Sequence, residues 1–152
     1  MAIALIGDSI LDNFYWLEDR KKDLKFSLEE LGYPTYNFAV DESQLGDIIY
    51  GIKPNEIYTE ARSYPYPVDA TGKVHPFILL SSVTCNLAVI SVGGNDLRVN
   101  LTKLIYGVDS FVGSIFNSKY LADLHHVIKA TKLYVFGSRV ILVCLYCPYL
   151  GS

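Results

Sequence analysis

The sequence predicts one α/β domain in which a parallel sheet lies between two layers of helices, as in flavodoxin-like proteins. Three observations support this prediction: short apolar runs alternate with helical patterns, the chain has 152 residues, and 51% of them are hydrophobic. Strands that alternate with helices form parallel sheets covered on both faces, and a chain of this length builds one compact core. The predicted order is β-α-β-α-β-α-β, with a long irregular excursion before the third strand.

The first strand and the first helix follow from hydrophobic patterning. Residues 2–6 are a continuous apolar run that ends at Gly7, which is typical of a strand buried on both faces. A helical pattern follows over residues 17–31, with leucines recurring on one side. We expect Gly32 to end this helix, because glycine readily adopts the left-handed conformation found at helix ends.

The second strand, at residues 35–40, leads to a short helix and then to the excursion. Asp41 or Ser43 is expected to cap that helix, which ends near Tyr50, since both residue types accept hydrogen bonds from a first turn. Residues 53–76 show neither helical nor strand periodicity and contain four prolines and three tyrosines. Irregular segments of this length are uncommon in compact domains, so we interpret this one as an excursion or lid over one end of the sheet.

The second half of the chain predicts two further strands around a long helix. Residues 87–91 are the third strand, residues 108–133 are helical with a break near Asn117, and residues 139–145 are the fourth strand. We expect the strand order 2-1-3-4. In such sheets ligands bind beside the carboxyl ends of strands one and three, where the direction of the connections reverses.

Charge and composition exclude several functional classes. A net charge of −3 argues against a nucleic-acid partner, which usually requires a basic stripe. The longest apolar run, residues 140–145, is far shorter than the ~20 residues of a membrane span, and the N-terminus lacks the basic region of a signal peptide. Three cysteines do not form a secreted disulfide framework. We therefore expect a cytoplasmic protein.

Two polar motifs follow strands one and three, on either side of the switch point at which the direction of the connections reverses. Asp8 and Ser9 come directly after the first strand, and Asn95 and Asp96 follow the third strand after two glycines. A serine at a strand-to-helix turn lies beside backbone N–H groups that can bind a tetrahedral oxyanion. Taken singly, each motif is also ordinary chemistry for a helix cap or a turn. Their expected meeting at one sheet edge is what indicates a site.

Both motifs resemble signature blocks of the SGNH/GDSL serine hydrolases. Residues 4–13, ALIGDSILDN, resemble the first block, and residues 91–97, SVGGNDL, resemble the third. Residues 140–148 resemble the strand that follows the third block in such proteins. The resemblance implies the SGNH hydrolase fold and cleavage of small acyl (carboxylic) esters, with no cofactor and no metal.

The resemblance also assigns roles. Ser9 is the nucleophile, and Asn95 donates its side-chain amide to the oxyanion together with the backbone N–H of Ser9. Four further residues are assigned to supporting this geometry: Asp8, Gly93, Gly94 and Asp96. For Asp96, simple capping of the turn is an equal alternative.

Two features depart from the family pattern. The second block has a glycine whose N–H is another oxyanion donor, and aligning residues 37–43 with that block puts Glu42 at its position. A positive φ would strain a glutamate, and its carboxylate is unfavourable beside an oxyanion unless it points away. The general-base histidine of the family lies in a C-terminal Asp-x-x-His block, whereas this sequence stops at Ser152, just after the fourth strand. We therefore expect a chain truncated there or completed by another segment.

Other candidate groups in the sequence are weaker. Asp123 and His126 spell Asp-x-x-His but lie in a helical pattern, where residues three apart share a face, so a surface Asp–His pair explains them. His75, in the excursion, is the remaining candidate for the general base. Cys144 and Cys147 lie in a strand pattern and face opposite ways, which does not suit a zinc or redox site.

Three functions remain open at this point. The first is ester hydrolysis through Ser9. The second is a non-catalytic protein of the same fold that binds a small ligand or partner at the switch point, which Glu42 and the unidentified base favour. The third is a phosphate- or nucleotide-binding module that uses the first helix N-terminus. Self-association is a further expectation, because the fourth strand is predicted to be an apolar edge.

Overall fold

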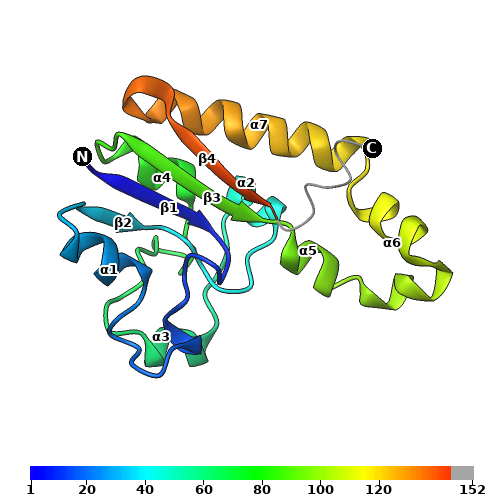
Figure 1. The fold of residues 1–152 in the computed structure, drawn as a ribbon, viewed down its shortest axis with the longest axis horizontal. Coiled ribbons are helices and arrows are strands. Elements are labelled where there is room, and N and C mark those ends of the chain that lie inside the picture. The colour runs from blue at the N-terminus through cyan, green and yellow to red at the C-terminus, as the bar shows by residue number, and fades with distance from the viewer. Residues whose placement is uncertain (145–152) are drawn as a thin grey trace.

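The computed structural model describes residues 1–144, and its centre is a four-stranded parallel sheet (Figure 1). The strands are β1 (Ile3–Gly7), β2 (Thr35–Asn37), β3 (Leu87–Val92) and β4 (Val140–Cys144). Their order is β2-β1-β3-β4, and every neighbouring pair is parallel. The predicted α/β class and strand order are therefore confirmed. Two predictions, the extension of the fourth strand to Leu145 and the place of Cys147, lie outside the described residues.

Helices connect the strands and cover both faces of the sheet. The α-helices of the described residues are α1 (Leu24–Glu30), α2 (Leu45–Tyr50), α3 (Glu56–Ala61), α4 (Pro76–Ser81), α5 (Gly94–Arg98), α6 (Val108–Ile115) and α7 (Ser118–Tyr134). Short 3₁₀ helices occur at η1 (Phe14–Trp16), η2 (Leu101–Tyr106) and η3 (Phe136–Ser138).

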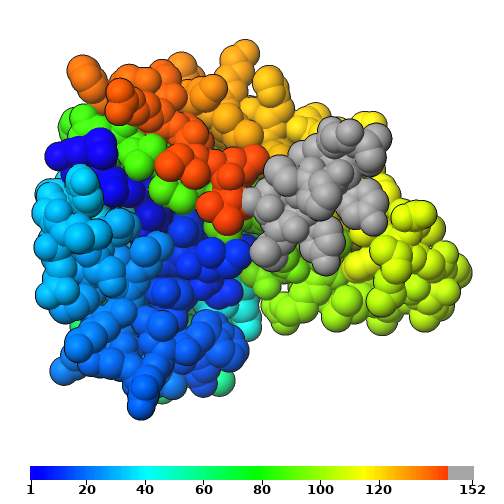
Figure 2. Space-filling view, in the orientation of Figure 1, coloured from blue at the N-terminus to red at the C-terminus, as the bar shows by residue number. Residues whose placement is uncertain are grey.

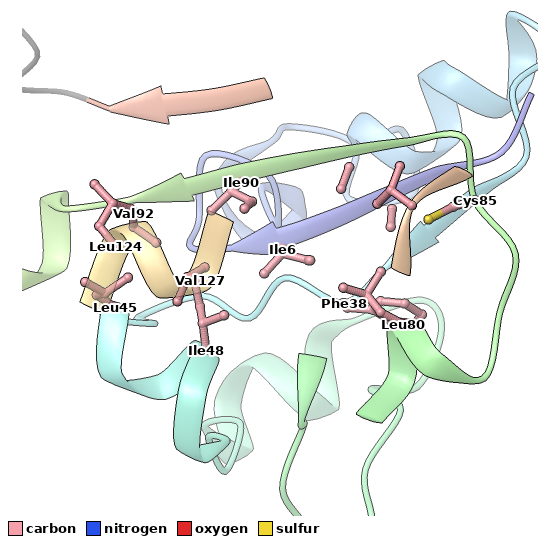
Figure 3. Packing of buried hydrophobic residues seen from close by; sticks show 13 residues of the cluster. Ile6, Phe38, Leu45, Ile48, Leu80, Cys85, Ile90, Val92, Leu124 and Val127 are labelled. Atoms are coloured by element: carbon pink, nitrogen blue, oxygen red, sulfur yellow. The ribbon is translucent and has the colours of Figure 1, made fainter. Parts of the chain in front are cut away.

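The sheet is the middle of three layers, because side chains alternate along each strand. Ala4 and Ile6 of β1 belong to the larger core, to which α2, α4 and α7 contribute. Figure 3 shows this core, with Ile6 near side chains of α2 and α7. Ile3 and Leu5 belong to the core on the opposite face, against which α1 packs.

The first predicted helix is shorter than residues 17–31. Asp23 accepts a hydrogen bond from the N–H of Phe26 at 3.0 Å and caps α1 there, so the residues before Asp23 are not part of the helix. The predicted end is confirmed, because Gly32 follows α1 with φ 91°. The prediction that Asp41 or Ser43 caps the next helix is wrong: Gln44 is the N-cap of α2, in a reciprocal arrangement with Asp47.

The predicted break in the long helix is confirmed. α6 and α7 are separate helices, and the side chain of Asn117 accepts a hydrogen bond from the N–H of Tyr120 at 3.0 Å to start α7. α5, η2 and α6 form an arm that extends away from the sheet (Figure 1), and Figure 2 shows this arm as a lobe projecting from the body of the protein. The arm has a small core of its own, formed by Leu97, Phe111, Val112 and Ile115.

Residues 53–76 contain α3 and pack against the body of the protein. Tyr66 and Val74 are buried in one cluster with Phe14 and Val40. Phe14 belongs to the segment that follows β1, and Val40 to the segment that follows β2. The excursion therefore contacts both loops that leave the carboxyl edge of the sheet at these strands.

The end of β1 lies unusually close to β3. Gly7 pairs with Ser91, and a Cβ atom on Gly7 would lie 1.9 Å from the backbone oxygen of Ser91. The φ of Gly7 is 126°, which other residues rarely adopt. Only glycine therefore permits this approach of the two strands.

We predict that Gly7→Ala lowers the free energy of unfolding by about 3 kcal/mol or more, because it adds both a backbone clash and an unfavourable φ. Urea unfolding followed by circular dichroism measures the loss. Gly113→Ala is the matched control, since Gly113 lies within α6 and a Cβ there meets no atom within 4 Å. The control is expected to gain about 0.5–1 kcal/mol. Equal effects of the two substitutions would contradict the prediction.

Candidate active site

Asp8 joins the two polar motifs at the carboxyl edge of the sheet. Its N–H donates to the backbone oxygen of Ser91 at 3.1 Å, and its carboxylate accepts from the Ser91 hydroxyl at 2.8 Å. The same carboxylate oxygen accepts from the N–H of Ile10 at 3.2 Å. Burial raises the pKa of Asp8, while these hydrogen bonds oppose the rise. Asp8 is therefore a structural support that holds the turn at residues 8–12, here named the serine turn, against β3.

Ser9 occupies a tight turn directly after β1. The backbone oxygen of Asp8 accepts from the N–H groups of Leu11 and Asp12, at 3.1 and 2.9 Å. Ser9 itself is half-buried, and within the described part of the chain neither its N–H nor its hydroxyl forms a hydrogen bond. Among residues 1–144, the hydroxyl and the N–H of Ser9 therefore have no hydrogen-bond partner.

Asn95 lies in the first turn of α5 with its side-chain amide held on two sides. Its Nδ2 donates to the backbone oxygen of Ser43 at 3.0 Å, and its Oδ1 accepts from Nε of Arg98 at 3.1 Å. A carbonyl oxygen only accepts and a guanidinium only donates, so these partners determine which way the amide is turned. The second N–H of Nδ2 has no acceptor among residues 1–144.

The glycines before Asn95 shape the turn out of β3. Gly93 has φ 110° and a Cβ on it would lie 3.6 Å from atoms of Phe116 and Tyr120. Gly94 is the first residue of α5. The positive φ at Gly93 turns the chain so that α5 starts directly at the edge of the sheet.

Asp96 connects the polar motif after β3 to the segment after β2. It is buried, and its Oδ2 accepts from the N–H of Leu45, in the first turn of α2, at 3.2 Å. Burial raises its pKa, and the nearby carboxylates of Asp47 and Asp8 raise it further. Its carboxylate thus joins α5 to α2. This contact between two helices is more than the capping of its own turn.

Glu42 has a backbone conformation that glycine favours. Residues 40–43 form a turn closed by a hydrogen bond of 3.1 Å from Ser43 N–H to Val40 oxygen, and Glu42 has φ 79° at its third position. Type II turns have positive φ at this position, and glycine favours it. The Glu42 carboxylate accepts from the hydroxyl of Tyr58 in α3 at 3.4 Å. The expected strain is therefore present, and the carboxylate is bonded to the excursion.

His75 contacts residues outside the serine turn. Its Nε2 is 2.9 Å from Oδ2 of Asp69, and its ring packs on the backbone of Gly51. It also lines a surface hollow with Asp69 and Ile78, of which Ser9 is not a part. All three histidines lie within residues 1–144, and none of them forms a hydrogen bond with Ser9. The structure thus leaves the general base unassigned among the described residues.

The Asp-x-x-His sequence in α7 has different partners from those expected. Asp123 pairs with Lys119 at 3.0 Å. The ring of His126 packs edge-to-face on Phe77 with centroids 6.4 Å apart. The expected surface Asp–His pair is therefore replaced by two separate contacts.

Sequence reasoning missed a buried polar network under the serine turn. Arg62 and Tyr66, from the excursion, contact Asp12, which follows Ser9 by three residues. Asp12 lies within residues 4–13, and Arg62 is the one arginine among residues 53–76. A basic residue within a tyrosine-rich apolar segment was the available signal, since such a residue needs an acidic partner when it is buried.

The described residues offer no ready metal site. No group of three or more His, Cys, Asp or Glu side chains within them is arranged to hold a metal ion. In the same part of the chain, no helix has the length and apolar character needed to cross a membrane. No family model, curated protein or solved structure matches this chain.

Asp41, beside Glu42, yields a testable pH dependence. Burial raises the pKa of Asp41 to about 6, although Nε1 of Trp16 donates to its carboxylate at 3.0 Å. The folded state therefore holds the Asp41 proton more tightly than the unfolded state. This contribution to stability is present below pH ~4 and is lost as pH rises through about 6.

We predict that Asp41→Asn raises the free energy of unfolding by about 2 kcal/mol at pH 7 and has little effect at pH 4. Asparagine keeps an oxygen that accepts from Trp16. Urea unfolding at the two pH values measures the difference. Asp69→Asn is the control with the opposite sign, because hydrogen bonds from Thr71 and Lys73 lower the pKa of Asp69 to about 2. A variant at Asp41 that is less stable at pH 7 than at pH 4, relative to the wild type, would contradict the prediction.

Proposed function

We propose that the protein is a serine hydrolase of the SGNH/GDSL type that cleaves small acyl esters through Ser9. The meeting of the two motifs at one sheet edge supports this most directly. Asp8 hydrogen-bonds Ser91 across the two strands. Within the described part of the chain, the hydroxyl and N–H of Ser9 and one N–H of the Asn95 amide have no hydrogen-bond partner. Backbone and side-chain N–H groups beside a serine are the donors that acyl transfer requires.

The proposed reaction proceeds through an acyl-enzyme. The Ser9 hydroxyl oxygen attacks the ester carbonyl carbon, and a base takes its proton. The resulting oxyanion accepts hydrogen bonds from the Ser9 N–H and from Nδ2 of Asn95. The tetrahedral intermediate then collapses, the proton passes to the departing alcohol, and water releases the acid by the same steps. Acyl transfer of this kind needs no cofactor.

The second candidate is a non-catalytic protein of the same fold that binds a small ligand at the switch point. One observation favours it: no histidine of the described residues is bonded to Ser9, and a serine without a base is a poor nucleophile. In this case the free hydroxyl and amide donors bind an acceptor group of the ligand without attacking it.

Ser9→Ala is expected to abolish hydrolysis of a short activated acyl ester, because it removes the attacking oxygen of the proposed reaction. Initial rates and labelling by a fluorophosphonate, detected by mass spectrometry, measure the effect. Ser27→Ala, at a serine within α1, is the matched control. Equal turnover in wild type and Ser9→Ala would exclude Ser9 as nucleophile, and no turnover by either protein would favour the second candidate function.

Asn95→Ala is expected to lower kcat by about 10²–10³, the usual effect of losing one oxyanion donor. KM should change little, since the oxyanion forms only along the reaction path. Asn86→Ala is the control, because Asn86 precedes β3 at the opposite end of the strand and bonds Ala2. A change confined to KM would show that Asn95 contacts the bound ester and not the transition state.

A further inference from the structure

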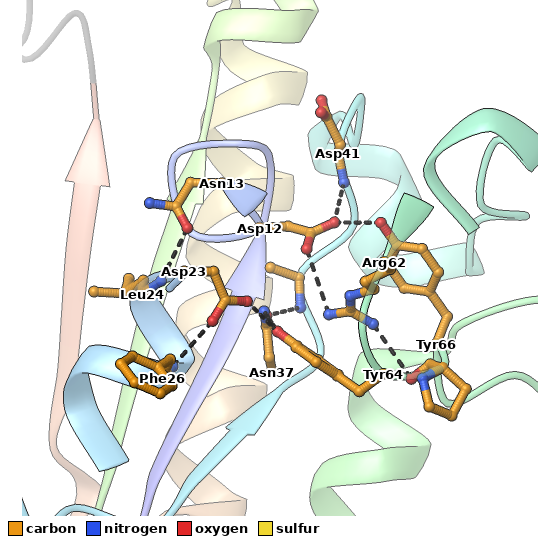
Figure 4. Close-up of polar contacts among 12 residues, drawn as sticks. Asp12, Asn13, Asp23, Leu24, Phe26, Asn37, Asp41, Arg62, Tyr64 and Tyr66 are labelled. Carbon is orange, nitrogen blue, oxygen red and sulfur yellow. Dashed lines mark hydrogen bonds and ion pairs between the residues drawn. The ribbon is translucent and has the colours of Figure 1, made fainter. Parts of the chain in front are cut away.

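A buried ion pair connects the excursion to the serine turn. Nη2 of Arg62 lies 3.4 Å from Oδ1 of Asp12, and both side chains are 0% exposed (Figure 4). Removing two charges from water is costly, so such a pair contributes little net stability compared with an apolar pair. The structural role of the Arg62–Asp12 pair therefore depends on the groups that it positions.

The guanidinium of Arg62 is enclosed by aromatic rings of its own segment. Its Cζ atom lies 4.2 Å from the ring centre of Tyr64 and 3.9 Å from that of Tyr66. The Tyr64 hydroxyl donates to Asp23, and the Tyr66 hydroxyl donates to Oδ2 of Asp12. Contacts with two aromatic rings restrict the guanidinium, and its Nη2 lies beside Oδ1 of Asp12.

Asp12 belongs to the turn that presents Ser9. Its N–H donates to the backbone oxygen of Asp8 at 2.9 Å, and its Oδ2 accepts from the N–H of Asp41 at 3.0 Å. Figure 4 shows Asp12 between Asp41 on one side and Arg62 and Tyr66 on the other. The carboxylate thus connects the serine turn to the turn at residues 40–43.

The turn at residues 40–43 in turn holds Asn95. The N–H of Val40 donates to the oxygen of Gly7 at 2.8 Å, and the oxygen of Ser43 accepts from Nδ2 of Asn95 at 3.0 Å. Between these two anchors lies Glu42 with its strained φ of 79°. The Asp12–Asp41 hydrogen bond opposes relaxation of that strain.

We propose that Arg62 is a positioning residue for the oxyanion site, acting through Asp12 and the turn at residues 40–43 on the side-chain amide of Asn95. The proposal rests on the proposed function of Asn95 as an oxyanion donor. Arg62 directs the Asp12 carboxylate, Asp12 holds the Asp41 N–H, and the turn then presents the Ser43 oxygen that orients Asn95. The excursion thereby supports catalysis through this chain of contacts and not through contact with the ester.

The test compares Arg62→Met with Arg20→Met, an exposed arginine that stacks on Tyr15 and has no bond to Asp12. Kinetics on a short activated ester give kcat and KM, and ¹⁵N–¹H spectra report the side-chain amide of Asn95. We expect Arg62→Met to lower kcat roughly tenfold with KM within about twofold, since the donor is displaced and not removed. The Asn95 amide resonances should move in Arg62→Met and stay in place in Arg20→Met.

A suppressor separates positioning from general loss of structure. Glycine adopts the φ of residue 42 without strain, so Glu42→Gly should restore most of the kcat that Arg62→Met loses. If Arg62→Met does not fold, as judged by circular dichroism, Tyr66→Phe removes only one hydrogen bond to Asp12 and should move the same resonances by a smaller amount.

The outcomes separate the two proposals. Asn95 resonances that move in Arg62→Met, or in Tyr66→Phe, support the positioning role even where the wild type does not turn over the ester. Asn95 resonances that stay in place in a folded Arg62→Met overturn it, even where Ser9→Ala establishes the nucleophile. A kcat that falls equally in Arg20→Met and Arg62→Met overturns it as well.

Discussion

The structure depends on the close approach of β1 and β3 at Gly7 and Ser91. Without a Cβ at Gly7, the Ser91 backbone oxygen can approach the end of β1 and accept the N–H of Asp8. The Ser91 hydroxyl then binds the Asp8 carboxylate. These contacts bring two segments more than 80 residues apart to one edge of the sheet. Every other feature of the candidate site is built on this contact.

Three loops meet at that edge, and each is tied to the next by a polar contact. Asp12 of the first loop binds the N–H of Asp41 in the second, and Ser43 and Leu45 of the second bind Asn95 and Asp96 of the third. Several of these groups are buried carboxylates, whose burial raises their pKa values and costs free energy. Strained backbone and buried charge often accumulate at functional sites, where geometry matters more than stability. Glu42 and the Asp12–Arg62 pair fit this description.

Hydrophobic patterning predicted most of the fold, and local chemistry explains where it failed. The strand order and the break before α7 follow from apolar runs and from Asn117, which act locally. The helix expected over residues 17–31 failed because Asp23 caps α1, and the leucine spacing before it is not used for a helix. The helices α3, α4 and α5 were not predicted, since helices of five or six residues are too short to show a clear period and depend on tertiary packing.

By itself the sequence determined the parallel sheet, its order, and the placement of Ser9 and Asn95 at adjacent strand ends. These follow from periodicity and from the rule that parallel strands share a carboxyl edge. Only the tertiary structure decided which groups touch: that Asn95 is turned by Ser43 and Arg98, that His75 pairs with Asp69, and that Arg62 reaches Asp12. Hydrogen bonds and ion pairs require donor–acceptor distances of about 3 Å, set to within a few tenths of an ångström, between groups on segments far apart in the chain. No local pattern of residues encodes such distances.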